Sequence, residues 1–178
     1  SGGTSFSTIS DVLFNFSVSA LICYPMANAA TSYIIPSSVT ELISSAFEGA
    51  NNITTLTLNS GLQIIGFLSL SSSSLTTLDI PASVTEIGAS AFYNTFNLVS
   101  INVDSSNTAY MSLAGVLYNK TQTTLLLYPS AKPDTTFSVP TGVTALGSDA
   151  IQYNYILTSI SLPSTLTSIG NNAIVTIS

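Results

Sequence analysis

Apolar and polar residues alternate along this chain in a short pattern that returns four times. The pattern has the form LxxLxL, and Thr, Ser, Asp or Asn stands between the apolar residues. The four copies are ITTLTL (53–58), LTTLDI (75–80), LVSINV (98–103) and LTSISL (157–162). Successive side chains of a β-strand point to opposite faces, so this alternation predicts strands with one buried face and one solvated face.

The copies are evenly spaced and belong to a longer repeat. The first three begin 22 and 23 residues apart, and the segments 35–58, 80–103 and 139–162 align over their whole length. Such a period, with leucine at fixed positions, is typical of a leucine-rich repeat solenoid, in which each turn contacts only its neighbours. We therefore predict a parallel sheet on one face of the solenoid and short helical or irregular turns on the other.

Glycine also recurs at one position of this repeat. Gly66, Gly88, Gly147 and Gly170 all follow the apolar residue of a segment such as SVTEIG. Because glycine has no Cβ, we expect a bend or a close approach of two backbones at this point.

A larger repeat of 104 residues contains the smaller one. Residues 11–42 align with residues 115–146 without a gap. Each copy begins with two apolar runs that flank a polar turn, and proline follows the second run. This pattern predicts a β-hairpin inserted into the solenoid. We predict one leucine-rich repeat domain over residues 1–178. Its parts are a hairpin-like N-terminal element (1–35), repeats (36–104), a second hairpin insert (105–138) and further repeats with a truncated last copy (139–178).

Composition restricts the partners and the location. Lys and Arg number 2 against 8 Asp and Glu, and the net charge is −6, so nucleic acid and anionic membranes are excluded as partners. Residues 12–40 carry no charge, but Pro25 and Pro36 interrupt them, which argues against membrane insertion. Only 6% of residues are charged, far below about 25% in ordinary globular proteins. Ser and Thr supply the polar surface instead, and we predict an extracellular or cell-surface location.

Three features of the sequence occur together: the segments IPSSVTELISSAF (35–47) and IPASVTEIGASAF (80–92), the LTTL and LTSI strands, and GVLYNKTQTTLLLYP (115–129). In these features the chain resembles the BspA-type leucine-rich repeat family of surface proteins. This resemblance implies the solenoid fold and a role as an adhesin or surface protein that binds host matrix or other cells. The departures, Leu70 and Ile151 in place of Phe and Ile43 in place of Gly, concern packing.

No set of residues predicts catalysis. The absence of histidine excludes Ser-His-Asp and Cys-His pairs and histidine metal ligands. The single cysteine, Cys23, aligns with Leu127 and is interpreted as a small buried hydrophobe rather than a reactive thiol. The eight acids are scattered, with no calcium-loop spacing. We therefore predict no enzyme activity, no cofactor and no metal.

The acidic residues are interpreted as solvated surface rather than as catalytic groups. Glu41, Gln63 and Glu86 are assigned to one repeat position, and they should form a surface ladder in which Gln63 separates two like charges. Three N-x-S/T sequons begin at Asn15, Asn52 and Asn119. They would be glycosylation sites in a host that glycosylates, although so many asparagines, serines and threonines produce sequons by chance.

Two surfaces are candidates for binding. The first is the outward face of the sheet, a flat and lightly charged surface. The alternative is that this face only keeps the protein soluble and binds nothing. Its residues are Thr55, Thr57, Thr77, Asp79, Ser100, Asn102, Ser159 and Ser161. The second is the loop edge that precedes each strand, with Tyr93 and Phe96 in one repeat and Tyr153 and Tyr155 in another. Aromatic residues favour interfaces, yet we expect one ring of each pair to turn inward.

These observations lead to two hypotheses of different classes. The favoured one is a non-enzymatic extracellular or cell-surface module for binding or adhesion, which recognises a protein or a glycan through its sheet face or loop edge. The alternative is a structural subunit that assembles head to tail into an extracellular filament through uncapped solenoid ends. An ice-binding surface is a third and weaker interpretation, because Asp79 and Asn102 interrupt the threonine rows.

Overall fold

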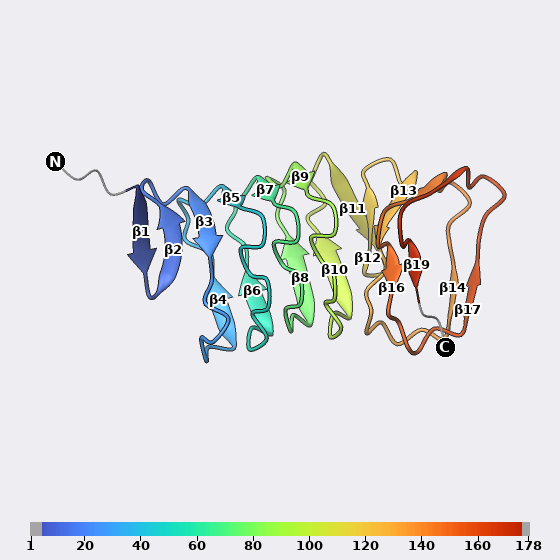
Figure 1. The fold of residues 1–178 in the computed structure, drawn as a ribbon. Coiled ribbons are helices and arrows are strands. Elements are labelled where there is room, and N and C mark those ends of the chain that lie inside the picture. Colours follow the sequence, from blue (N-terminus) through green and yellow to red (C-terminus); the bar gives the residue numbers. More distant parts are fainter. Residues whose placement is uncertain (1–4, 176–178) are drawn as a thin grey trace.

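The chain forms a β-solenoid in the computed structural model, which describes residues 5–175 (Figure 1). The strands are β1 (Phe6–Ile9), β2 (Val12–Asn15), β3 (Ala20–Cys23), β4 (Ser32–Ile34), β5 (Glu41–Leu42), β6 (Thr55–Thr57), β7 (Ile64–Ile65), β8 (Thr77–Ile80), β9 (Glu86–Ile87), β10 (Ser100–Val103), β11 (Tyr110–Leu113), β12 (Val116–Asn119), β13 (Thr124–Leu127), β14 (Thr136–Ser138), β15 (Ala145–Leu146), β16 (Ile151–Gln152), β17 (Ser159–Ser161), β18 (Ser168–Ile169) and β19 (Ile174–Val175). No helix long and apolar enough to cross a membrane occurs among these residues.

One face of the solenoid is the predicted parallel sheet. Strands β4, β6, β8 and β10 lie side by side in that order, and β8 pairs with β10 in parallel with Leu78 opposite Ile101. Both side chains point inward and are buried. The prediction that the LxxLxL strands stack in one parallel sheet is therefore confirmed for the repeats before the second insert.

Of the two alternatives predicted for the other face, short helical turns are wrong for residues 5–175, which form no helix. A second parallel ladder runs there through β5, β7 and β9. Each coil has only 22 or 23 residues in which the chain must turn several corners. Ser45, Leu68 and Ser90 lie at the same corner of successive coils and have positive φ. Segments between corners are too short for i→i−4 bonding, so their N–H groups bond to the neighbouring coil instead.

The register of this second ladder also corrects the predicted row of acidic residues. Glu41 pairs with Ile64, and Ile64 pairs with Glu86. Ile64, not Gln63, therefore separates the two carboxylates. The diverged repeat is one residue shorter at another point, and only the strand pairing fixes which residue shares the row.

The expected close approach of two backbones is confirmed at three of the four recurrent glycines, Gly66, Gly88 and Gly170, and is looser at Gly147. The amide of Gly88 donates to the carbonyl of Ile65 at 2.7 Å. A Cβ added to Gly88 would lie 2.5 Å from the backbone nitrogen of Phe67. Gly66 and Gly170 are equally close to the coil before them. Glycine is therefore required for one coil to rest directly on the next.

Each insert is a three-stranded antiparallel meander rather than a two-stranded hairpin. The predicted strands are β2 with β3 and β12 with β13, and both pairs contain the same register shift. The additional strands, β1 and β11, precede two-residue turns with positive φ at Ser10 and Asp11 and at Ala114 and Gly115. Such turns favour hairpins. β3 and β13 then pair in parallel with β5 and β15 and join the solenoid.

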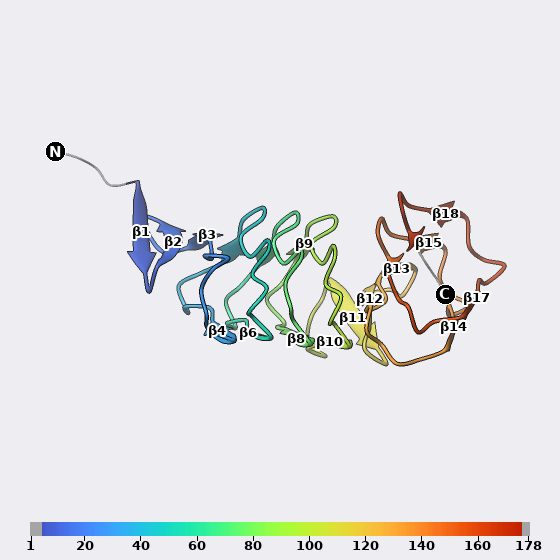
Figure 2. The same cartoon turned by 60° about the horizontal axis from the view of Figure 1, so that its bottom comes forward.

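The second insert separates two parts of the hydrophobic core. Leu117 and Leu127 belong to the cluster that includes the preceding coils, whereas Val116, Tyr118 and Leu125 belong to the cluster of the following coils. Figure 2 shows the coils before the insert edge-on and the coils after it, in orange and red, closer to face-on. The solenoid axis therefore bends at the second insert.

The first insert has only one of its faces covered, and this corrects the interpretation of the cysteine. Val12, Phe14 and Leu21 are buried against the following coils. Cys23 is exposed, although its counterpart Leu127 is only 7% exposed. Leu127 is covered by the coil that precedes the second insert, and the described part of the chain has no such coil ahead of Cys23.

The first prediction concerns the glycine contacts between coils. Gly88→Ala should destabilise the protein by about 1–3 kcal/mol, because its Cβ would force two backbones apart. Gly142→Ala is the matched control, since the nearest atom to its Cβ is 4.0 Å away, and it should change stability by less than about 0.5 kcal/mol. Urea unfolding followed by circular dichroism measures both. Equal losses in the two variants would contradict the role of close packing.

The second prediction concerns stability at alkaline pH. Burial raises the pKa of Tyr118 to about 12, whereas tyrosine in an unfolded chain titrates near ~10. Between these values the unfolded chain loses a proton that the native protein keeps, so stability falls as pH rises and the contribution is fully present below about pH 10. The urea midpoint should be lower at pH 11 than at pH 8, and Tyr118→Phe should reduce the difference. An unchanged difference in that variant would show that Tyr118 is not responsible.

Candidate functional site at the bend of the solenoid

A cleft lies where the second insert interrupts the stack of coils. It has a volume of about 290 Å³, and three parts of the chain line it. Ser90 and Tyr93 come from the coil before the insert, Tyr110 and Leu127 from the insert, and Asp149 from the coil after it. We call this the junction cleft. It forms beside the point where the coil after the insert bonds to the insert instead of to the coil before it: the amide of Gly147 donates to the Leu125 carbonyl at 2.8 Å.

Asp149 connects the two sides of the junction cleft. Its carboxylate accepts hydrogen bonds from the Ser90 hydroxyl, across the cleft, and from the Gln152 side-chain amide. The side chain of Gln152 is buried, and its carbonyl oxygen has no hydrogen-bond partner. The carboxylate therefore links the two coils.

Aromatic rings from both halves of the solenoid meet beside this carboxylate. The Tyr153 ring lies 6.5 Å from Tyr93 and 5.6 Å from Phe96, measured between ring centroids, and both pairs are edge-to-face. A hydrogen bond with Tyr93 raises the pKa of Tyr153. We call Tyr93, Phe96, Tyr153 and Tyr155 the aromatic edge.

The burial of these rings agrees with the expectation that one ring of each pair turns inward. Tyr93 and Tyr153 are half-buried. Phe96 is 50% exposed and Tyr155 is 63% exposed. Tyr93, Phe96 and Tyr153 therefore join the halves of the solenoid, and Phe96 and Tyr155 also present large surfaces to solvent.

Tyr153 has a backbone conformation that is unfavourable for a large side chain. Its φ is 50°, in the left-handed region. Other coils place Gly49, Ser72 and Asn94 in this conformation at the equivalent position, and these small or turn-forming residues tolerate it better. Strain of this kind is concentrated at functional sites, where the rest of the structure imposes it.

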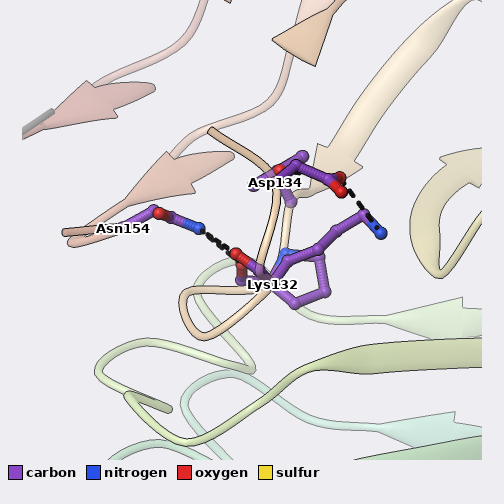
Figure 3. Close-up of polar contacts among 5 residues, drawn as sticks. Lys132, Asp134 and Asn154 are labelled. Atoms are coloured by element: carbon purple, nitrogen blue, oxygen red, sulfur yellow. Dashed lines mark hydrogen bonds and ion pairs between the residues drawn. The ribbon is translucent and has the colours of Figure 1, made fainter. Parts of the chain in front are cut away.

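Asn154 holds the loop that carries Tyr153 and Tyr155. Its amide nitrogen donates to the carbonyls of Pro129 and Lys132, each at 3.2 Å, and its oxygen accepts from the amides of Ile156 and Leu157. Figure 3 shows Asn154 pointing to the Lys132 backbone beside the Lys132–Asp134 ion pair, whose atoms are 3.2 Å apart. The second insert thereby positions the loop that carries Tyr153 and Tyr155.

The predicted sheet face is divided between two sheets. Thr55, Thr57, Thr77, Asp79 and Asn102 are exposed on one sheet and Ser100 is half-buried there. Asn102 donates to Asp79 across the strands at 2.8 Å. Ser159 and Ser161 lie on β17, which pairs only with β14 in a separate sheet of the described chain. The second insert separates the two rows, so the eight residues do not form one surface.

The sequon asparagines have structural roles in the turns. Asn15 accepts hydrogen bonds from the amides of Ser19 and Ala20 and donates to the Ser19 hydroxyl. Asn119 makes the equivalent contacts in the second insert. Asn52 is exposed and donates to the Asn28 carbonyl at 2.9 Å. A glycan on one of these side-chain nitrogens would replace one of its two N–H donors. Glycosylation of the sequons stays a prediction.

Sequence reasoning missed Asp149, Ser90 and Gln152 as members of the site. The acidic residues are scattered along the sequence, and no local motif joins Ser90 and Asp149, which are 59 positions apart. The one available signal was Tyr153, which stands where sister coils have glycine, serine or asparagine. Within residues 5–175, no three His, Cys, Asp or Glu side chains are grouped as a metal site would require.

Comparison with known proteins identifies the repeat. The model of the BspA type leucine rich repeat region matches six copies, over residues 22–121 and 130–177. A comparison with curated proteins finds no match. Among solved structures, a leucine-rich cell surface protein of Faecalibacterium prausnitzii is 31% identical, with a TM-score of 0.74, over 80% of this chain and 38% of that chain.

Two more distant structures share the fold. A leucine-rich repeat protein of Eubacterium ventriosum is 24% identical, with a TM-score of 0.64, over 90% of this chain and 57% of that chain. The pneumococcal vaccine antigen PcpA is 18% identical, with a TM-score of 0.65, over 98% of this chain and 70% of that one. The chain thus spans 38% and 57% of the first two proteins. The family model and the 31% identity together show that this chain belongs to the BspA-type leucine-rich repeat family.

Proposed function

We propose that the chain is a non-enzymatic binding or adhesion module of a cell surface, and that it recognises a protein or a glycan through the aromatic edge. The supporting observation is the convergence of Tyr93, Phe96 and Tyr153 from both sides of the bend, next to a cleft of about 290 Å³. The F. prausnitzii relative is described as a cell surface protein, and the low charge of this chain agrees with that location.

The aromatic edge suits binding better than the sheet face does. Exposed aromatic rings beside a cleft supply large contact areas at a low cost in side-chain entropy, and such residues dominate binding energies. Phe96 and Tyr155 are anchors of this kind. On the sheet face, Asn102 and Asp79 already bond to each other, and the threonine side chains offer only small contacts.

The third prediction compares the two surfaces by substitution. The edge variant carries Phe96→Ala and Tyr155→Ala, which remove exposed rings and spare the half-buried Tyr93 and Tyr153. The face variant carries Thr57→Lys, Asp79→Lys and Asn102→Lys. Binding to a panel of immobilised matrix glycoproteins, measured by surface plasmon resonance, should weaken about tenfold or more in the edge variant. The face variant should bind as the unaltered chain does.

The same assay separates the remaining outcomes. Binding lost in the face variant but kept in the edge variant would move the site to the sheet face. Binding that disappears when the glycoproteins are enzymatically deglycosylated would identify the ligand as glycan rather than protein. If the unaltered chain binds no member of the panel, adhesion to this class of surface is refuted. Urea midpoints of both variants control for loss of folding.

Head-to-tail assembly into a filament is the alternative function. It is supported by exposed apolar residues at opposite ends of the described solenoid, such as Phe6 at 58% and Ile169 at 57%. Light scattering over a range of concentrations distinguishes the two functions. Rods that grow with concentration would favour the filament, whereas a constant mass equal to one chain would exclude it.

A further inference from the structure

We propose that the junction cleft binds an extended peptide segment of a partner protein, apolar with a lysine or arginine, which adds as a strand beside residues 92–94. This binding mode rests on the proposed function and narrows its ligand from a protein or a glycan to a peptide segment. The binding groups are two backbone amides, those of Phe92 and Asn94, in the coil that forms one wall of the cleft. We call them the two free amides.

The equivalent amides of other coils donate to the next coil. Leu70 and Ser72 donate to the carbonyls of Ala91 and Tyr93, at 3.0 and 2.8 Å. The same two bonds join the coils on either side: Phe47 to Ser69, Gly49 to Ser71, Ile151 to Ala173 and Tyr153 to Val175. Two amides at alternate residues thus form the donor row through which a coil holds whatever lies next to it.

The second insert occupies the acceptors that the two free amides would use. By repeat position these acceptors are the carbonyls of Ala150 and Gln152. Ala150 accepts instead from the amide of Tyr128 at 2.7 Å, and Gln152 accepts from the Ser130 hydroxyl at 3.0 Å. Among the residues that the structure describes, neither free amide donates a hydrogen bond. Unpaired backbone donors of this kind are a template for another chain.

The segment that carries the two free amides has a repeat position that pairs as a β-strand elsewhere. Ile151 and Gln152 occupy the same positions as Phe92 and Tyr93. They form β16, which pairs in parallel with β19, and Figure 1 shows the two strands side by side. An extended peptide presents carbonyls to one side at alternate residues, which matches the spacing of the two free amides.

The junction cleft suits a single segment rather than a folded partner. The coil of Phe92 forms one wall, and Leu126 and Leu127 of the second insert belong to the other. Because both walls belong to this chain, a whole coil or domain is excluded from the space between them. The volume of about 290 Å³ is at the lower end of ligand sites, which span about 300–1,000 Å³, so few residues of a peptide fit.

Apolar walls select apolar side chains of the segment. Ile87, Tyr110 and Leu126 line the cleft and are half-buried, so they retain apolar surface that a ligand can cover. Removal of such surface from water favours binding of leucine, isoleucine or phenylalanine side chains.

One carboxylate selects the charge of the segment. In the described chain, Asp149 is the one charged residue among those that line the cleft. Its two oxygens accept from Ser90 and Gln152, and a carboxylate offers about four acceptor sites. A lysine or arginine of the segment can therefore pair with Asp149, and the net charge of −6 attracts such a segment. An anionic ligand would be repelled.

Hydrogen exchange measured by NMR tests the two free amides directly. In the unliganded chain, Phe92 and Asn94 should exchange at least about a hundredfold faster than Leu70 and Ser72, because exchange of bonded amides requires local opening. Equal protection of the two pairs would overturn the proposal, since the donors would then already be satisfied.

A random octapeptide library displayed on phage supplies the probe. Peptides enriched on the immobilised chain should have apolar residues at alternate positions and a lysine or arginine. A synthetic peptide of the enriched sequence should slow exchange at Phe92 and Asn94 by roughly tenfold or more and leave Leu70 and Ser72 unchanged. Absence of enrichment over the blank support, or a bound peptide that protects neither free amide, would overturn the proposal.

A variant that fills the cleft provides a matched comparison. Ala89 lines the cleft and is exposed, and Phe67 occupies the same repeat position in the preceding coil, so the solenoid accepts a ring there. Ala89→Phe should weaken peptide binding by roughly tenfold or more, because the ring takes up space in the cleft. Ser44→Phe is the control, at the same repeat position but outside the cleft, and should bind as the unaltered chain does. Equal binding by the two variants would contradict the cleft as the site.

The glycoprotein assay distinguishes the peptide segment from the wider binding function. Ala89→Phe should weaken binding to the matrix glycoproteins, as the edge variant does. Full binding by Ala89→Phe, with loss in the edge variant, would overturn the peptide segment and leave the binding function in place. Loss of binding on deglycosylation would also overturn it, in favour of a glycan. A chain that selects peptides and binds no glycoprotein would refute the proposed adhesion and support the peptide site.

Discussion

The bonding of each coil to the next is the constraint on which this structure depends. Strands of two to four residues have no partner inside their own coil, so their backbone groups pair only with neighbouring coils. Apolar side chains stack in the same direction, as Val39, Leu62 and Val84 do in the core. Each position of the repeat is thus restricted by the coils on both sides. Glycine is needed at residue 88 because a Cβ there would lie 2.5 Å from the backbone nitrogen of Phe67.

The inserts obey the same constraint by different means. One edge of each meander continues the solenoid in parallel, through β3 to β5 and through β13 to β15. The side chains of β12 alternate, so Val116 and Tyr118 pack on the following coils while Leu117 packs on the preceding ones. Because a meander is not a coil, the strands of the two stacks that it joins are separated and do not pair with each other among the described residues. The bend of the axis and the junction cleft are consequences of that separation.

Regular repeats and irregular junctions differ in what they offer to a ligand. The regular sheet face carries small polar groups in rows, and some of them bond to each other. The bend instead gathers rings that are distant in sequence, around a carboxylate that both Ser90 and Gln152 bind. A strained Tyr153 in place of glycine, serine or asparagine is part of this arrangement. The site exists because the stack is interrupted.

The sequence by itself determined the period, the inward residues, the strand type and the duplicated inserts, because each depends on local alternation or on repeated spacing. It did not determine that β5, β7 and β9 form a second parallel ladder where helical turns were an alternative. Nor did it determine the pairing of Glu41 and Glu86 with Ile64, or the exposure of Cys23. Nor did it bring Asp149 to Ser90, or separate Ser159 and Ser161 from the first sheet. These features depend on which coil or insert lies next to a residue in space. Identical local patterns have different neighbours on the two sides of an insert, so only the tertiary structure decides them.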